Sequence, residues 1–179
     1  MSLRVHVGNP ADAVESAFFR IQQERMADVP LLNPALCVEA VDFQRWNGHW
    51  LGIILTPWCM SILLLPGSDG GWISAGENKR RFIKFPVGDL AFLGSDEPEL
   101  GEFQSCALFS PMDRFATRSE AVLTARASLL ALLAPPALPV PAASPGEAAP
   151  AVPAARGTPP GQPSLSRRRF MVPGRTAGR

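Results

Sequence analysis

The sequence predicts an α+β domain with one helix before an antiparallel β-sheet of about six strands, one helix after it, and a disordered Pro/Ala-rich tail. Three observations predict this architecture. Short apolar segments alternate with turn signals over residues 35–109. Apolar residues recur at helical spacing on both sides of that region. Most of the 19 prolines lie after residue 134, in a composition that cannot bury a core.

Composition divides the 179 residues into four expected parts. They are a flexible N-terminus at residues 1–9, a single domain at 10–133, a linker at 134–165 and a basic segment at 166–179. Residues 1–133 hold 11 Lys and Arg against 15 Asp and Glu, a net charge of −4, whereas residues 134–179 hold 6 against 1, a net charge of +5. Because the folded part is acidic, we expect no nucleic-acid partner.

The first helix is expected at residues 10–26. Asn9-Pro10 or Asp12 can cap its first turn. Val29-Pro30 is expected to end it, because the residue before a proline is disfavoured in the helical region. Its apolar residues at helical spacing are Val14, Phe18 and Ile21.

Three strands are expected next, at residues 35–43, 50–55 and 58–65. Asn47-Gly48 is a strong hairpin signal, because both positions tolerate a positive φ, and it joins the first two strands. Pro57 suits the tight turn between the second and third. Neither of these last two strands alternates between polar and apolar residues, so both are expected to be buried on both faces at the centre of the sheet.

Two other structures for residues 51–65 are disfavoured by the sequence. A buried helix would carry Pro57 in its middle, at a cost of about 3 kcal/mol. A membrane span needs about 20 apolar residues, more than this segment provides. We therefore expect no stable membrane insertion, and, since no signal peptide is visible at the N-terminus, a cytoplasmic protein.

Shorter strands are expected at residues 81–85, around 90–93 and at 103–109, with the acidic stretch at 96–99 separating the last two. The last strand alternates, which places two sets of side chains on opposite faces. One face carries Phe103, Ser105, Ala107 and Phe109, and the other carries Gln104, Cys106 and Leu108.

The second helix begins at a capping box, in which Thr117 is followed three residues later by Glu120. Pro135-Pro136 stops it. Its expected apolar side consists of Val122, Leu123, Leu129, Leu130 and Leu133.

The residues that could carry catalysis do not occur at the spacing that a catalytic site needs. Neither His6 nor His49 has a nucleophile and an orienting partner at a local spacing, so both are expected to be structural or solvated. Glu39 and Asp42 are three apart on a strand and are expected to point to opposite faces, as charges at the rim of the sheet. We therefore expect no enzyme activity, no catalytic residues and no resident cofactor.

The three cysteines are an odd number without C-x-x-C spacing, which argues against a disulfide framework or a structural zinc site. Burial is the ordinary outcome for free cysteines such as Cys59 and Cys106. The functional alternative is a thiol that meets a metal centre or a partner, for which Cys106 is the stronger candidate.

Trp46 and Trp58 lie beside turns, where an indole is often partly exposed. Core packing is the ordinary alternative for both, but tryptophan is also a frequent anchor in protein interfaces. The basic segment joins Arg167 and Arg168 to apolar residues, which indicates either a solvated tail or a tethered recognition segment. The candidate partner-binding residues are Thr56, Pro57, Trp58, Trp46, Cys106, Arg167, Arg168, Gly174 and Arg175.

Several segments resemble the HybE/HupJ family of nickel-iron hydrogenase assembly chaperones. The residues that carry the resemblance are those of 33–43, 48–58, Leu65-Pro66-Gly67 and 105–111, with Arg167-Arg168 and Gly174-Arg175 near the C-terminal end. The run from Gly52 through Thr56-Pro57-Trp58 to Gly67 is the most specific. The linker at 134–165 is longer and richer in proline than the resemblance leads us to expect, and Arg169 is a further departure.

The resemblance implies a non-catalytic maturation factor in the cytoplasm. Its implied partners are the small subunit precursor of an uptake hydrogenase, the large subunit precursor or both, with other maturation factors as further candidates, before cofactor-complete assembly and twin-arginine export. Some relatives carry a fused rubredoxin domain, but this chain lacks the C-x-x-C pairs that such an iron site needs. The alternative function is a small binding module that contacts a metal centre or ligand during cofactor handover.

Overall fold

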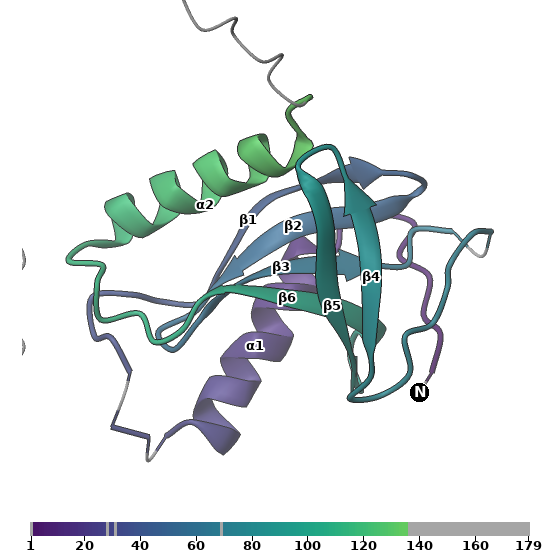
Figure 1. Cartoon of the computed structure of the whole chain (residues 1–179). Coiled ribbons are helices and arrows are strands. Elements are labelled where there is room, and N and C mark those ends of the chain that lie inside the picture. The colour runs from purple at the N-terminus through teal and green to yellow at the C-terminus, as the bar shows by residue number, and fades with distance from the viewer. Residues whose placement is uncertain (1, 28, 31, 69, 136–179) are drawn as a thin grey trace, which may run out of the picture. The chain divides into compact units, whose positions relative to one another are not determined.

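The computed structural model describes residues 2–27, 29–30, 32–68 and 70–135. Within them, six strands form one antiparallel sheet, with one helix before it and one after it, as the sequence predicts (Figure 1). The linker from residue 136 onwards and the basic segment lie outside the described residues. The elements are α1 (Ala11–Arg25), β1 (Glu39–Trp46), β2 (His49–Leu55), β3 (Met60–Leu65), β4 (Arg80–Phe85), β5 (Gly88–Glu97), β6 (Gly101–Phe109) and α2 (Arg118–Leu133).

The sheet has the strand order β1-β2-β3-β6-β5-β4. Two meanders, β1–β3 and β4–β6, meet where β3 pairs with β6, so β1 and β4 are the outermost strands. The two helices cover opposite faces of the sheet (Figure 1). This arrangement explains why β2 and β3 are buried along their entire lengths.

Alternate residues of the central strands enter two separate cores. Leu51, Ile53 and Leu55 of β2 join the cluster under α2, whereas Trp50 and Ile54 join the cluster under α1. The expectation that these strands are buried on both faces is confirmed.

The Asn47-Gly48 turn has the predicted backbone, with φ of 48° and 81°. Gly52 of β2 has no side chain, and this leaves room for the Phe43 ring of the neighbouring strand β1. A Cβ there would lie 2.5 Å from the Phe43 ring, so any larger residue would displace the aromatic group.

The capping box of α2 forms as predicted, with the Thr117 hydroxyl accepting from the Glu120 N–H at 3.2 Å. The predicted apolar side of this helix is partly wrong, because Leu123 and Leu130 are 66% and 73% exposed. The small side chains of Ala121 and Ala125 let the helix backbone approach the sheet closely, so the helix presents the face that carries them. That face consists of Ala121, Ala125, Leu129 and Leu132.

The first strand begins four residues later than predicted. Asn33 forms a turn in which its side chain accepts from the Ala35 N–H at 2.9 Å, so the extended conformation starts only at Glu39. The register of β1 then shifts between Val41 and Gln44, and Asp42 has a φ of 49°. This bulge reorients the side chains that follow it.

The bulge overturns the expectation that Glu39 and Asp42 point to opposite faces. Both carboxylates pair with arginines of α2. Glu39 binds Arg118 through two contacts of 2.8 Å, and Asp42 lies 3.3 Å from Arg126.

A second bulge corrects the predicted faces of β6. Met60 pairs with Phe109 and Ser61 with Ala107, which leaves Leu108 as an extra residue. Phe109 therefore packs with Leu108 in the cluster under α2, and not with Phe103 in the cluster under α1.

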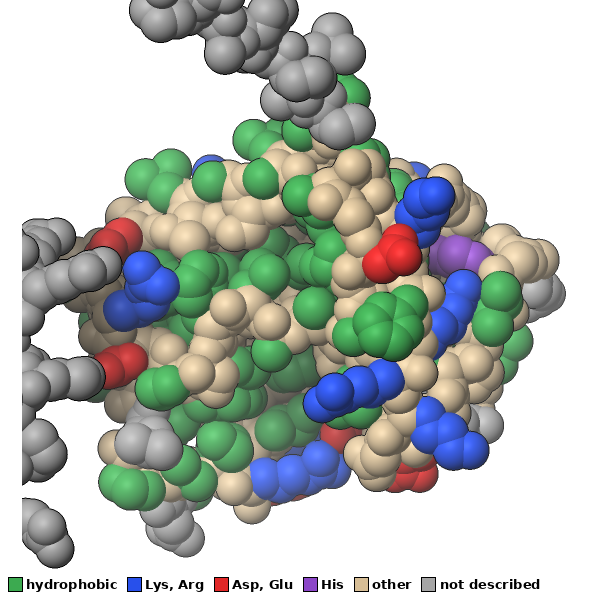
Figure 2. Space-filling model, viewed as in Figure 1, with side chains coloured by type: hydrophobic (Ala, Val, Ile, Leu, Met, Phe, Trp, Pro, Cys, Tyr) green, Lys and Arg blue, Asp and Glu red, His purple; other side chains and the backbone are tan. Residues whose placement is uncertain are grey.

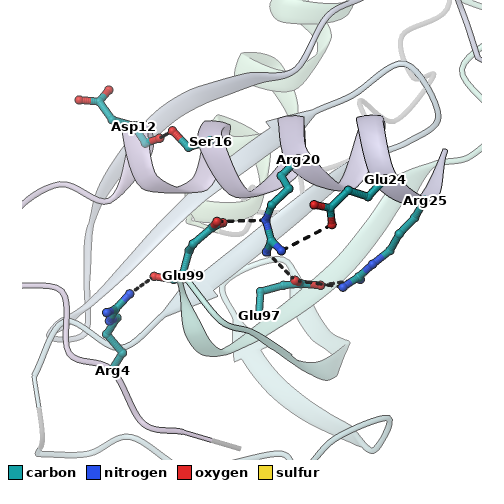
Figure 3. A network of polar contacts seen from close by, with 8 residues as sticks. All are labelled: Arg4, Asp12, Ser16, Arg20, Glu24, Arg25, Glu97 and Glu99. Carbon is teal, nitrogen blue, oxygen red and sulfur yellow. Dashed lines mark hydrogen bonds and ion pairs between the residues drawn. The ribbon is translucent and has the colours of Figure 1, made fainter. Parts of the chain in front are cut away.

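The acidic stretch that was expected to separate two strands instead extends β5 to Glu97. Glu97 is 7% exposed and receives Arg25 at 2.7 Å and Arg20 at 3.4 Å (Figure 3). Arg20 also lies 3.0 Å from Glu99. These ion pairs fasten α1 to the end of β5, a role that the sequence analysis did not anticipate.

Residues 2–9, which were expected to be flexible, make specific contacts with the sheet. The Glu102 N–H donates to the Ser2 carbonyl at 2.8 Å, and the Trp50 indole N–H donates to the His6 carbonyl at 2.8 Å. Gly101 permits this approach, since a Cβ there would lie 2.5 Å from the Ser2 oxygen. Paired backbone groups thus hold this segment in place.

Candidate partner-binding surface

The Thr56-Pro57-Trp58 turn closes on itself through the Thr56 side chain. The Thr56 hydroxyl accepts from the Cys59 N–H at 2.9 Å and donates to the Cys59 carbonyl at 2.7 Å. The Thr56 N–H also donates to this carbonyl, at 2.9 Å. Thr56 is therefore a structural residue of the turn, because its polar atoms are already satisfied.

Exposure within this turn differs from the expectation. Thr56 and Pro57 are buried, so neither side chain is available as an exposed contact. Trp58 is half-buried, as expected for an indole beside a turn. Of the three residues, Trp58 alone presents a side chain that a partner can reach.

Asn33 connects this turn to the segment that precedes α2. Its backbone N–H donates to the Pro57 carbonyl at 2.9 Å, and its side-chain amide donates to the Met112 and Phe115 carbonyls, both at 2.8 Å. The sequence identified Asn33-Pro34 only as the opening of a strand. Donors to carbonyls about 80 residues away leave no local signal in a sequence.

A groove lies beside this junction, with a volume of about 430 Å³. Hydrophobic side chains gather over this part of the molecule, towards the left of the view in Figure 2. Mostly apolar residues and one carboxylate line the groove: Pro30, Leu32, Asn33, Pro34, Pro111, Asp113, Phe115 and Ala116. Such a lining suits an apolar side chain with a polar or basic neighbour.

Trp58 belongs to the same junction. The Ser110 hydroxyl donates to the Trp58 carbonyl at 3.4 Å, which connects the turn to the groove segment. Exposed Arg114 places its guanidinium 4.9 Å from the centre of the Phe109 ring and 5.7 Å from that of Phe115. Tryptophan and arginine around an apolar groove are the residue types that dominate the energetics of protein interfaces.

Two other candidates lie apart from this junction. Trp46 is at the opposite end of β2 from Thr56, because it pairs with His49 at the first residue of that strand. A strand of seven residues spans about 20 Å, so a single side chain of a partner cannot contact both Trp46 and the turn at Thr56. Trp46 is half-buried and stacks on Phe85, which gives it a structural role.

Cys106 lies in the middle of β6, opposite Ile62, and packs against the cluster under α2. Burial raises the pKa of its thiol, so the nucleophilic, metal-binding thiolate form is disfavoured. Cys37 is the exposed cysteine, whereas Cys59 is half-buried. Among the described residues, no three His, Cys, Asp or Glu side chains come together to hold a metal ion.

Both histidines contact backbone groups. His6 Nε2 lies 3.0 Å from the Leu100 carbonyl, and His49 Nδ1 accepts from the Gly67 N–H at 3.3 Å. His49 is buried against the edge of Trp72, and this burial is the main cause that lowers its pKa. These are contacts of structural histidines, as the sequence analysis expected.

The remaining candidates, Arg167, Arg168, Gly174 and Arg175, lie outside the described residues. None of the helices that the structure describes is long and apolar enough to cross a membrane.

Comparison with known proteins places the chain in a family. The family model of the NiFe-hydrogenase assembly chaperone HybE matches residues 9–173. The hydrogenase expression/formation protein HupJ of Bradyrhizobium diazoefficiens is 40% identical over 124 residues, which are 69% of this chain and 72% of that protein. The protein HoxT of Cupriavidus necator is 36% identical over 141 residues, which are 72% of this chain and 78% of that protein.

The fold agrees with a solved structure as well. The solution structure of HybE from Escherichia coli superposes with a TM-score of 0.62 at 24% identity, covering 88% of this chain and 98% of that one. This likeness concerns the fold, whereas the sequence matches identify the family. The chain belongs to the HybE family of NiFe-hydrogenase assembly chaperones.

Proposed function

We propose that this protein is a non-catalytic chaperone that binds the small or large subunit precursor of an uptake NiFe hydrogenase. Binding would take place in the cytoplasm, before cofactor-complete assembly and twin-arginine export, together with other maturation factors. Membership of the family supports the maturation role. The observation that carries the docking proposal is the apolar groove beside half-buried Trp58, where Asn33 joins three chain segments.

The groove is a suitable docking site because its rim combines the two properties that a precursor needs. Apolar walls accept a hydrophobic side chain that the unassembled subunit exposes, and Asp113 and Arg114 provide charges of both signs around it. Asn33 fixes the groove, since its amide holds the Met112 and Phe115 carbonyls. A fixed site loses little conformational entropy on binding.

The test is a pull-down of each subunit precursor, expressed separately, on the immobilised full-length protein. Trp58→Ala and Leu32→Glu are the test variants, because the first removes the exposed indole and the second puts a charge into the groove. Leu123→Ala is the matched control, an exposed apolar residue on the outer side of α2. Recovery of a precursor that the test variants lose and the control retains is the expected result. Recovery of neither precursor by the unchanged protein would refute the proposal.

The basic segment is a second proposed contact, through Arg167, Arg168, Gly174 and Arg175. A linker of about thirty residues would hold it near a client already bound at the groove, which raises its effective concentration. Removing residues 134–179 is expected to weaken precursor binding. An unchanged affinity would eliminate the second contact and leave the groove proposal intact.

The alternative function, contact with a metal centre during cofactor handover, has less support from the geometry. Cys106 is half-buried and its thiol pKa is raised, which disfavours a thiolate ligand. Docking of a protein is therefore the function that this surface favours.

A further inference from the structure

The β4–β5 hairpin carries an exposed face that the groove does not include. Directly paired residues of an antiparallel pair share one face. Phe82 is 71% exposed and Leu93 is 37% exposed on this face. The pairs that form it are Arg80 with Leu93, Phe82 with Ala91, and Lys84 with Asp89. We call these six residues, Arg80, Phe82, Lys84, Asp89, Ala91 and Leu93, the hairpin face.

The hairpin face is basic although the folded part of the chain is acidic. Its charged residues, Arg80, Lys84 and Asp89, give a net charge of +1, while residues 1–133 carry a net charge of −4. Four other arginines are in ion pairs, namely Arg20, Arg25, Arg118 and Arg126. Within the described part of the chain, Arg80 and Lys84 make no ion pair. Figure 2 shows basic and acidic side chains beside an exposed hydrophobic group on this side of the molecule.

The hairpin also offers hydrogen-bonding groups at its free edge. β4 is an outermost strand, paired with β5 on one side. The Gly94 N–H donates to the Lys79 carbonyl at 2.9 Å, so odd-numbered residues of this segment direct their backbone groups towards β5. By alternation, Arg80, Phe82 and Lys84 direct theirs away from the sheet.

Protection of the sheet edge does not explain this arrangement. Charged residues on an outermost strand prevent unwanted pairing with other chains, and this accounts for Arg80 and Lys84. An exposed phenylalanine between them has the opposite effect, because it adds an apolar anchor to the open edge. A binding role accounts for the cations and the aromatic ring together.

We propose that the hairpin face docks an extended acidic segment of a protein partner. The segment pairs with the free edge of β4, places an apolar side chain against Phe82 and Leu93, and sets carboxylates beside Arg80 and Lys84. Charge complementarity selects an acidic partner, because the face has a net charge of +1 and, although Asp89 lies opposite Lys84, neither Arg80 nor Lys84 is in an ion pair among the described residues. This site extends beyond the groove and does not depend on the identity of the client bound there.

The test uses a fluorescein-labelled peptide of eight residues in which Glu and Ile take turns at every second position and Thr fills the positions between, so that carboxylates and apolar side chains share one face of the extended peptide. It is titrated with the full-length protein in anisotropy measurements. A peptide with Lys in place of Glu is the charge control. The variants are Phe82→Ala and Lys84→Glu. Their controls outside the face are Leu130→Ala, which truncates another exposed large apolar side chain, and Lys79→Glu, which makes the same charge change. Because the basic C-terminal segment is present throughout, the comparison between variants decides the result.

The acidic peptide is expected to bind, and each test variant to weaken it by about tenfold while the controls stay within about twofold. Methylating alternate backbone nitrogens of the peptide is expected to abolish binding, because edge pairing needs those N–H groups. Equal affinities for Lys84→Glu and Lys79→Glu, or no binding of the acidic peptide, would overturn the proposal. So would tighter binding of a single-stranded DNA oligonucleotide that competes with the peptide, because the face would then be a polyanion site.

Discussion

Trp46 stacks on Phe85, with ring centroids 4.6 Å apart and an angle of 17° between the planes, although the two residues end the outermost strands β1 and β4. The sheet therefore curls until its two edges meet at one corner. Phe85 continues the contact by stacking on Phe92, whose centroid lies 5.8 Å away. This aromatic row closes the end of the cluster under α2.

Trp46→Ala is expected to lower the free energy of unfolding by about 2 kcal/mol. Phe85 loses its stacking partner, and removal of the half-buried indole leaves a gap between the sheet edges. Trp46→Phe should recover part of the loss, because a ring can still stack on Phe85. Urea denaturation followed by circular dichroism measures both values.

Trp58→Ala provides the contrast, since this indole is also half-buried but lies at the proposed docking site. We expect a loss below about 1 kcal/mol in stability together with weaker precursor binding. If the two alanine variants lose stability equally, the division between a structural Trp46 and a binding Trp58 is wrong.

Local signals explain why so much of the fold is predictable from this sequence. The Asn47-Gly48 hairpin and the Thr117 capping box each act within four residues, and both formed as predicted. The bulge at Asp42 had no such signal, because it is set by how β1 fits between β2 and α2. A pattern with period two cannot reveal an inserted residue.

The candidate site was predictable only in outline. The sequence selected the turn at residues 56–58, but a list of residue types does not show that the Thr56 hydroxyl would be satisfied within the turn. Asn33 and the groove were missed, since they depend on contacts across about 80 residues. The sequence left Trp46 open between core packing and partner binding, because the Phe85 ring on which it stacks lies on the far edge of the sheet.

Glu97→Ala is expected to lower the free energy of unfolding by about 1 to 2 kcal/mol. The side chain is 8% exposed and binds Arg25 and Arg20, whose own exposures of 58% and 30% moderate the effect through solvent screening. Urea denaturation at low and high salt measures it, and the loss should shrink at high salt.

A double-mutant cycle of Glu97→Ala with Arg25→Ala isolates the 2.7 Å ion pair. The expected coupling is about 0.5 to 1 kcal/mol. Strict additivity of the two losses would show that Glu97 acts through packing and not through its charge.

Asn33→Ala is expected to destabilise the protein by about 2 kcal/mol, because the side chain loses its bonds with the Met112 carbonyl, the Phe115 carbonyl and the Ala35 N–H. The Phe115 carbonyl is left without that donor, whereas the Met112 carbonyl still accepts from the Phe115 N–H at 3.2 Å. Asn33→Asp is the near-isosteric control. Its carboxylate cannot donate to the Met112 and Phe115 carbonyls, so it should not rescue the loss. Thermal melting measures the stability of each variant, and pull-down of the precursor measures binding at the groove. Wild-type melting of Asn33→Asp would contradict the donor role.

His49 predicts how stability depends on pH. Burial, the largest cause, lowers the pKa of His49 below its ordinary value of 6.5, and Arg81 and Arg45 lower it further, whereas a hydrogen bond with the Gly71 backbone raises it. The unfolded chain therefore binds more protons than the folded chain below about pH 6.5, so stability is lost as the pH falls through that region. The loss is at most about 1.4 kcal/mol per pH unit. The urea midpoint is expected to fall as the pH is lowered from about 8 to about 5.5, and to fall less steeply for His49→Gln than for the unchanged protein. His6 is present in both proteins, so it does not cause the difference. Identical slopes would show that His49 does not titrate differently in the two states.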